Sequence, residues 1–317
     1  ITNPELFNLG ASTSATQLPV MTTVERIAMT GLSDGEMIFN STTDKVEYWD
    51  GTKWYGITYE AITFSVDYLI VAGGGGTYAG GGANYMGGGG AGGLRTSYGS
   101  TSGGGAVAEP SISLSRATSY NITVGQASLA GEDSVFGSIT SLGGGRSGAT
   151  PSTAAGSSGG SGGGASGDAY NAAGGSGTAN QGYSGGNSGP SCSGGSCRYP
   201  GGGGGGAASA GTNATTTTAG NGGDGLEVNI IGGTGNYYAG GGGGSSYSSG
   251  AGTGGLGGGG NGSASSSPVV NNGTANTGGG GGGGLVASST PALGGSGVVI
   301  LRYATADITS YTTTGIT

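Results

Sequence analysis

The chain has 317 residues, of which 85 are glycine, and a formal net charge of −8 with no histidine. The lack of histidine excludes Ser-His-Asp and Cys-His catalytic pairs and histidine-based zinc sites. The eight Lys and Arg residues are spread thinly, so we expect no binding to nucleic acid.

The first part of the chain, residues 1–60, is predicted to form a separate N-terminal module. Thr22 is followed three residues later by Glu25, which is the spacing of a capping box at the start of a helix. We expect Gly31 to end this short helix, because glycine readily adopts the left-handed conformation found there.

A β-hairpin is predicted after this helix. Asp50-Gly51 is a strong turn signal, and it lies between two strand-like segments, 45–49 and 52–57. Both tryptophans and both lysines of the chain lie in this module. Because so short a module buries little apolar surface by itself, we expect it to drive homo-oligomerisation or to dock on a partner protein.

Short strand-like segments frame and interrupt the rest of the chain. They are rich in β-branched residues, partly alternating, and bounded by Gly, Pro or Ser. These segments are residues 66–72, 111–114, 120–124, 134–140, 226–231 and 298–303. We therefore expect a β frame that anchors both ends of the glycine-rich part.

Between residues 73 and 297 the composition leaves no conventional core. All but six of the 85 glycines lie there, and residues 143–225 contain no Leu, Ile, Val, Phe, Met or Trp. The apolar side chains whose burial drives folding are therefore absent. One interpretation is a disordered segment, since the content of Leu, Ile, Val and Phe in the whole chain is below about 20%.

The other interpretation is an ordered form that requires glycine. A polyproline-II-type helix has three residues per turn and no internal hydrogen bonds, so its N–H and C=O groups must find partners on neighbouring chains. Only glycine lets several such helices approach closely. The low net charge and the tyrosines beside the glycine runs favour this ordered form.

The predicted fold is therefore mostly β and irregular. It comprises a small N-terminal β/helix attachment module over residues 1–60 and a β-framed bundle of extended polyglycine-II helices over residues 61–305. Residues 306–317 are expected to form a C-terminal tail.

No motif in the sequence favours an enzyme. Glu132-Asp133 and the pair Asp224 and Glu227 leave carboxylate-pair hydrolysis formally open, but solvated or turn-forming acids are the favoured interpretation. Residues 252–257 match G-x-G-x-x-G without following a strand or opening a helix, so the dinucleotide interpretation fails. We expect no catalytic residues, no cofactor and no metal. The longest apolar stretch has only the length of a strand, so membrane insertion is not expected.

Cys192 and Cys197 are the only cysteines, and they enclose residues 193–196. Two thiols without a further Cys or His are too few for a structural zinc site. A local disulfide and two reduced cysteines both stay open. Closing so small a loop would contribute about 2 kcal/mol.

Two parts of the chain resemble bacteriophage tail-fibre proteins. Residues 18–57, through LPVMTTVER, MIFN and EYWDG, resemble a segment that recurs in those proteins. Residues 66–303 resemble the glycine-rich domain of phage tail fibres and other virion proteins, through YLIVAGGGG, SVFGSI, NTGGG and GVVILRY. The resemblance implies a polyglycine-II domain in a virion protein of an extracellular particle, either a tail-fibre component or a tip adhesin. It also implies a homo-oligomer, trimeric by analogy, or attachment to another fibre protein.

The resemblance further implies that receptor contacts lie in variable loops, with a host-surface glycan or an outer-membrane protein as the partner. Tyrosine suits such loops because it offers a large, rigid contact area with a polar tip. The candidate receptor-binding residues beside glycine runs are Tyr78, Tyr85, Tyr170, Tyr183, Tyr199, Tyr237, Tyr238 and Tyr247. Capping of the bundle's ends is the competing interpretation for about half of them.

Two other functions stay open at this stage. One is a purely structural fibre or capsid-decoration protein without receptor binding. The other is an ice-binding glycine-rich protein, which should present a regular array of Thr or Ala. Residues 215–218 form only one local run of threonine, so this alternative ranks low.

Overall fold

The computed structural model divides the chain into two compact units, unit 1 (Ile1–Ile62) and unit 2 (Thr63–Thr317). The structure describes residues 18–57, 63–78, 85–116, 118–149, 153–190, 192–193, 196–197, 199–247, 250–264, 269–285 and 290–305. The predicted boundary near residue 60 and the predicted tail, 306–317, lie outside these ranges. Within them, no helix has the length and apolar character needed to cross a membrane.

Unit 1 contains a four-stranded sheet and one short helix. The sheet has the order β1 (Val20–Met21), β2 (Met37–Asn40), β3 (Lys45–Trp49) and β4 (Trp54–Ile57). β1 runs parallel to β2, and the other neighbours are antiparallel. Helix α1 (Thr23–Ile27) lies between β1 and β2 in the chain.

The start of α1 is as predicted, but its end is not. The Thr22 amide donates to Glu25 Oε2 at 2.7 Å, and the Glu25 amide donates to Thr22 Oγ1 at 3.3 Å, which completes the capping box. The helix ends at Ile27 with Ala28 as its cap, so the expectation that Gly31 ends it is wrong. The Ala28 amide reaches carbonyl oxygens of the last turn without help from glycine.

The predicted hairpin turn between β3 and β4 is confirmed. Asp50 Oδ1 accepts hydrogen bonds from the amides of Thr52 and Lys53, both at 2.8 Å, and Gly51 has a φ of +90°. Hydrogen bonds from the Lys53 amide and from the hydroxyl and amide of Thr52 lower the pKa of Asp50 to about 2.

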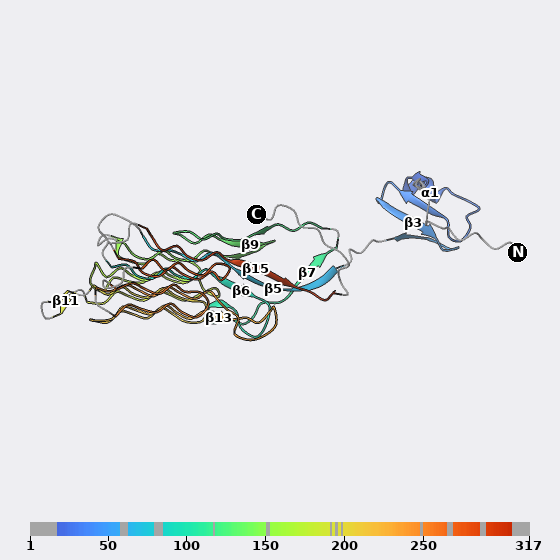
Figure 1. The fold of residues 1–317 in the computed structure, drawn as a ribbon. Helices are drawn as coiled ribbons and strands as arrows, with labels where there is room; N and C mark the ends of the chain where they lie inside the picture. Colours follow the sequence, from blue (N-terminus) through green and yellow to red (C-terminus); the bar gives the residue numbers. More distant parts are fainter. Residues whose placement is uncertain are drawn as a thin grey trace. The chain divides into compact units, whose positions relative to one another are not determined.

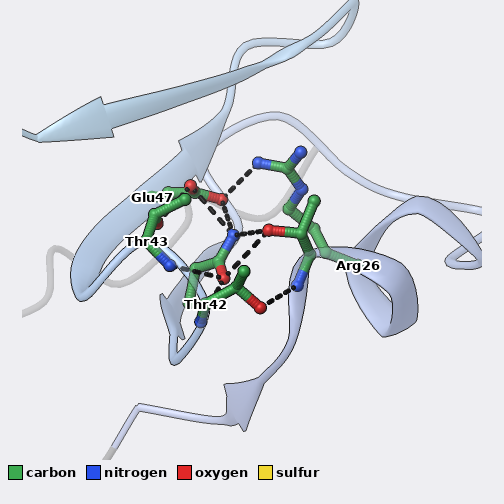
Figure 2. Close-up of polar contacts among 6 residues, drawn as sticks. Arg26, Thr42, Thr43 and Glu47 are labelled. Atoms are coloured by element: carbon green, nitrogen blue, oxygen red, sulfur yellow. Dashed lines mark hydrogen bonds and ion pairs between the residues drawn. The ribbon is translucent and has the colours of Figure 1, made fainter.

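A buried polar cluster ties α1 to one face of the sheet (Figure 2). Glu47 on β3 is 4% exposed, and Asn40 on β2 is fully buried. Arg26 Nη1 of α1 donates to Glu47 Oε2 at 2.5 Å, and Asn40 Nδ2 lies 3.0 Å from both carboxylate oxygens. Burial alone would raise the pKa of Glu47, but the hydrogen bonds from Asn40, Arg26 and Thr43 outweigh it and lower this pKa.

Unit 2 is organised around strand β5 (Thr63–Val71). β5 pairs antiparallel with β15 (Val298–Arg302), β6 (Leu94–Thr96) and β7 (Ile112–Ser115). The strands that enter and leave the glycine-rich part, β5 and β15, are therefore hydrogen-bonded to each other, as expected for a β frame at both ends of that part.

Strand β5 is buried on both faces. Val66, Tyr68 and Ile70 belong to one apolar cluster, which also contains Leu114 and Phe136. The alternate residues of the strand, Leu69 and Val71, belong to a second cluster with Leu94 and Val228. Because successive side chains of a strand point to opposite faces, β5 supplies the centre of both clusters.

The remaining strands of unit 2 are short. They are β8 (Ile122–Thr123), β9 (Ser134–Phe136), β10 (Ile139–Ser141), β11 (Cys192–Ser193), β12 (Ser196–Cys197), β13 (Leu226–Glu227) and β14 (Tyr237–Tyr238), with one 3-10 turn at Gly103–Gly105. The segment predicted as one strand, 134–140, is a hairpin, because Gly137 turns the chain with a φ of +57°. The described residues are mostly strand and irregular, which confirms the predicted fold class.

The glycine runs are joined by hydrogen bonds between segments that are far apart in the chain. In the run 201–207, amides three positions apart donate to the same neighbouring segment. The amides of Gly201, Gly204 and Ala207 donate to the carbonyl oxygens of Ser245, Gly242 and Ala239 in one neighbouring segment. Those of Gly202 and Gly205 donate to Ala165 and Gly162 in a second segment, and those of Gly203 and Gly206 to Thr212 and Ser209 in a third. Their donor–acceptor distances run from 2.8 to 3.1 Å.

A repeat of three is the pattern that an extended helix with three residues per turn gives, and it supports the predicted polyglycine-II bundle. The run 240–246 follows the same rule. Its amides at 240, 243 and 246 donate to carbonyl oxygens at 257, 260 and 263, and those at 241 and 244 to oxygens at 223 and 220. Figure 1 shows the segments as long extended traces that lie side by side.

The interior of this bundle has no room for side chains. A Cβ atom on Gly88, Gly204 or Gly242 would lie far inside contact distance of a backbone carbonyl oxygen, that of Gly242, Gly89 and Gly281 respectively. In glycine a hydrogen atom of Cα takes that direction and needs far less room than a Cβ atom. The neighbouring backbones therefore exclude every residue except glycine at these positions.

We expect Glu47 to make unit 1 sensitive to acid. A carboxyl with a lowered folded-state pKa stabilises the fold above its unfolded pKa, about 4.3, and this contribution is lost as the pH falls through the folded pKa. Glu47→Gln should destabilise unit 1 by about 3 kcal/mol at pH 7 and flatten the acid dependence of its melting temperature. Thermal denaturation of the full chain from about pH 7 to pH 3 measures both effects.

The matched control is Asp44→Asn, which also removes one carboxylate from unit 1 but at an exposed turn residue. It should leave the melting temperature at pH 7 nearly unchanged. An acid dependence that persists unaltered in Glu47→Gln would contradict the assignment to Glu47.

Gly204→Ala should destabilise unit 2 by at least about 1–3 kcal/mol, because the new methyl group would collide with the carbonyl of Gly89. Gly284→Ala is the control, since a Cβ at Gly284 has nothing within 4 Å. Because alanine lowers the conformational entropy of the unfolded chain, Gly284→Ala should leave the free energy of unfolding unchanged or raise it by about 0.4–1 kcal/mol. Equal melting temperatures for the two variants in calorimetry would show that the bundle interior is not tightly packed.

Candidate functional site

Three of the predicted tyrosines form one aromatic group in unit 2, which we call the tyrosine cluster. Tyr85 stacks on Tyr199 with ring centroids 5.2 Å apart and an interplanar angle of 5°. Tyr247 meets Tyr85 edge-on, at 5.9 Å and 86°. Tyr247 is 54% exposed, whereas Tyr85 and Tyr199 are half-buried. Three segments that are far apart in sequence thus meet in one partly exposed aromatic surface.

The backbone of Tyr85 is held by its neighbours in the bundle. Its carbonyl oxygen accepts hydrogen bonds from the Gly167 amide at 2.8 Å and from the Ser166 hydroxyl at 3.1 Å. Tyr85 also pairs with Leu285 in an isolated antiparallel bridge. Its ring is therefore placed by the fixed backbone of three different segments.

Tyr199 follows β12 and has a φ of +46°, a left-handed conformation that is costly for a residue other than glycine. The β11–β12 hairpin lies at one end of unit 2, at the left in Figure 1. Tyr247 directly follows Ser246, whose amide donates to the Ser263 carbonyl at 3.2 Å. Hydrogen bonds therefore fix the backbone at Tyr85 and beside Tyr247, and a left-handed turn sets the backbone of Tyr199.

The electrostatics of the cluster keep its central phenol neutral. Burial raises the pKa of Tyr85, and the neighbouring Tyr247, Asp168 and Tyr199 raise it further. At neutral pH Tyr85 therefore carries its proton. The cluster combines neutral aromatic rings with phenol groups that can donate and accept hydrogen bonds, beside the carboxylate of Asp168.

Tyr78 and Tyr170 lie outside the cluster. The Arg146 guanidinium is 5.4 Å from the centroid of the Tyr78 ring, within range of a cation–π interaction. Tyr170 is 67% exposed. Tyr78 therefore contacts a cation, and Tyr170 faces solvent.

The other three predicted tyrosines are more closely built into the fold. Tyr183 is half-buried, with its hydroxyl next to Gly105. Tyr237 and Tyr238 form β14, and Tyr238 is 8% exposed in the apolar cluster that contains Val71 and Leu94. Tyr238 therefore occupies the position of a packing residue.

Asp168 and Arg146 are neighbours of the predicted tyrosines that the sequence did not single out. Arg146 reaches Tyr78 because the two runs lie together, as shown by the hydrogen bond from the Ser147 amide to the Gly76 carbonyl at 3.1 Å. No spacing along the chain signals this contact. Asp168 stands two positions before Tyr170, but nothing local to it indicates the proximity to Tyr85.

The acidic residues considered for catalysis bond to backbone amides. Asp133 accepts from Gly143 at 2.7 Å, and Asp224 accepts from Leu256 at 2.9 Å. Glu227 accepts from Gly235 at 2.7 Å, and Glu132 from Gln126 at 3.3 Å. These contacts are those of structural, turn-forming acids. In the ranges that the structure describes, no three His, Cys, Asp or Glu side chains are arranged to hold a metal ion.

The two cysteines lie at paired backbone positions of a short hairpin. In the antiparallel pairing of β11 with β12, Cys192 is the partner of Cys197. Their side chains lie outside the described part of the structure, so a disulfide and two reduced cysteines both stay open.

Comparison with known families gives two matches. Residues 51–304 match the family model of a glycine-rich domain. Residues 3–67 match the model of a phage tail like trimerisation region. Searches of curated proteins and of solved structures gave no match.

Proposed function

The chain belongs to the glycine-rich domain family, and we propose that it is a tail-fibre adhesin that binds the host surface through its tyrosine cluster. The two family matches support a phage tail structural protein, a component of the virion, that forms homo-oligomers through its N-terminal region. The proposal adds that the partner is a host-surface glycan or an outer-membrane protein.

The observation that carries the proposal is the convergence of Tyr85, Tyr199 and Tyr247. Rings that served only to pack would be expected to be buried, yet Tyr247 is 54% exposed. Tyrosine presents a large amphipathic surface at low cost in conformational entropy, which suits a binding surface. The rings pack against one another, stacked for Tyr85 and Tyr199 and edge-on for Tyr247, so little freedom is lost when a ligand contacts them.

The glycine bundle suits this role because it separates scaffold from surface. Its interior excludes side chains, so sequence variation must be confined to the connections and the outer residues. A rigid scaffold with variable connections is a common arrangement for binding sites. The bundle then holds Tyr85 of the tyrosine cluster in place through hydrogen bonds to its backbone.

A purely structural fibre is the second candidate, and the other tyrosines favour it. Tyr238 packs in an apolar cluster, and Tyr78 contacts Arg146. An ice-binding role gains no support, because Thr215 and Thr218 form a local turn in which their hydroxyl groups are 2.7 Å apart. Such a turn does not provide a flat, regular array.

The double variant Tyr199→Ala/Tyr247→Ala should reduce binding of the labelled full chain to cells of the phage's host by at least about tenfold, as expected for loss of interface hot spots. Its melting temperature should fall only slightly, since Tyr247 is exposed and Tyr199 contributes one stacked pair, worth about 0.5–1.5 kcal/mol. Tyr237→Ala is the control, because it removes a half-buried tyrosine from β14, outside the cluster. Unchanged binding by the double variant would favour the structural fibre.

A further inference from the structure

We propose that copies of this chain assemble as a trimer through one face of the unit 1 sheet, which we call the open face. It comprises Met37, Phe39, Val46, Tyr48, Tyr55 and Ile57. This inference rests on the homo-oligomeric part of the proposed function and assigns the surface that performs it.

The strand register places these six residues on one side of the sheet. Met37 pairs with Tyr48, and Tyr48 with Tyr55, so the three residues form one row across β2, β3 and β4. Directly paired residues of neighbouring strands lie on the same face. The open face therefore begins with a row of one methionine and two tyrosines.

A second row lies two residues along each strand. Phe39 pairs with Val46, and Val46 with Ile57. Val20 of β1 is the partner of Phe39 and extends this row to the fourth strand. Since side chains alternate with a period of two, both rows point to the same side. Every side chain of the open face is thus aliphatic or aromatic.

The part of the opposite face that lies next to α1 is already covered, whereas Lys45 and Gly56 of that face are exposed. It carries Ile38, Asn40 and Glu47, which are all buried. Thr23 and Arg26 of α1 bond to Asn40 and Glu47, so the helix lies over this side. Within the described residues of unit 1 no helix lies over the open face, although the Lys53 ammonium lies 4.6 Å from the centroid of the Tyr55 ring at its edge.

The open face is exposed to a degree that is unusual for apolar residues on one surface. Met37, Tyr48, Tyr55 and Ile57 are between 37% and 45% exposed. Among residues 18–57, Ile38 is the only hydrophobic residue that is fully buried. A contiguous exposed apolar surface of this kind marks an interaction site.

Further copies of the same chain are the partner that fits this surface. The open face lies entirely within residues 3–67, which match a phage tail like trimerisation region. A closed threefold arrangement brings three identical surfaces together. Three open faces that meet would supply the apolar core that a single unit 1 lacks.

Helix α1 offers the competing surface. Val24 and Ile27 are 77% and 71% exposed, and they lie one helical turn apart. They are two isolated side chains on a five-residue helix, whereas the open face has two continuous rows. The geometry therefore assigns the interface to the open face.

The test compares Ile57→Asp with Ile27→Asp in the full chain, by light scattering and sedimentation velocity at micromolar concentration. The same change is made on the two competing surfaces. Ile57→Asp should convert the trimer to monomers, with at least a tenfold weaker association, and Ile27→Asp should remain trimeric. Tyr48→Ser provides a second, uncharged change in the open face and should also weaken association at least tenfold.

Circular dichroism and the thermal transition of unit 2 monitor folding in each variant. If Ile57→Asp does not fold, the result for Tyr48→Ser decides the test. Dissociation by Ile27→Asp, or a trimer retained by both open-face variants, would overturn the inference. A monomeric unmodified chain would instead overturn the homo-oligomeric part of the proposed function.

Discussion

The hydrogen bond between the backbones of neighbouring glycine segments is the interaction on which unit 2 depends. Each such bond contributes about 0.5–1.5 kcal/mol net. Ordering a glycine costs about 0.5–1 kcal/mol more than ordering an alanine. An isolated segment makes none of these bonds, because an extended helix of this kind has no internal hydrogen bonds, so it cannot be stable by itself. The arrangement is favourable only where a segment bonds to neighbours along its whole length, as the run 201–207 does: its amides reach three segments, and its carbonyl oxygens accept from others.

This constraint explains where glycine and where larger side chains occur along the chain. Glycine is required where carbonyl oxygens of adjacent segments occupy the Cβ direction, and side chains gather at strand β5, in the connections and in unit 1. Strand β5 gives the bundle two small apolar clusters as anchors. Unit 1 has the opposite composition, with many apolar side chains and few of them buried, which fits the role in homo-oligomerisation that its family match supports.

Much of the local structure could be predicted from the sequence, because short-range signals determine it. The capping box of Thr22 and Glu25, the Asp50-Gly51 turn and the strands at 66–72 and 298–303 are present as expected. The partners of each glycine run could not be predicted, because runs of identical composition carry no side chains that distinguish one neighbour from another. For the same reason the eight tyrosines could be proposed, but not the convergence of three of them.

Amide hydrogen exchange in the run Gly201–Gly206 tests the central claim most directly. These residues have no side chains, so slow exchange there can come only from backbone bonds to neighbouring segments. We expect exchange at least about a thousandfold slower than in an unstructured chain, and faster exchange at Gly99, an exposed turn residue of the same unit. Exchange of Gly201–Gly206 at the rate of an unstructured chain would contradict the account.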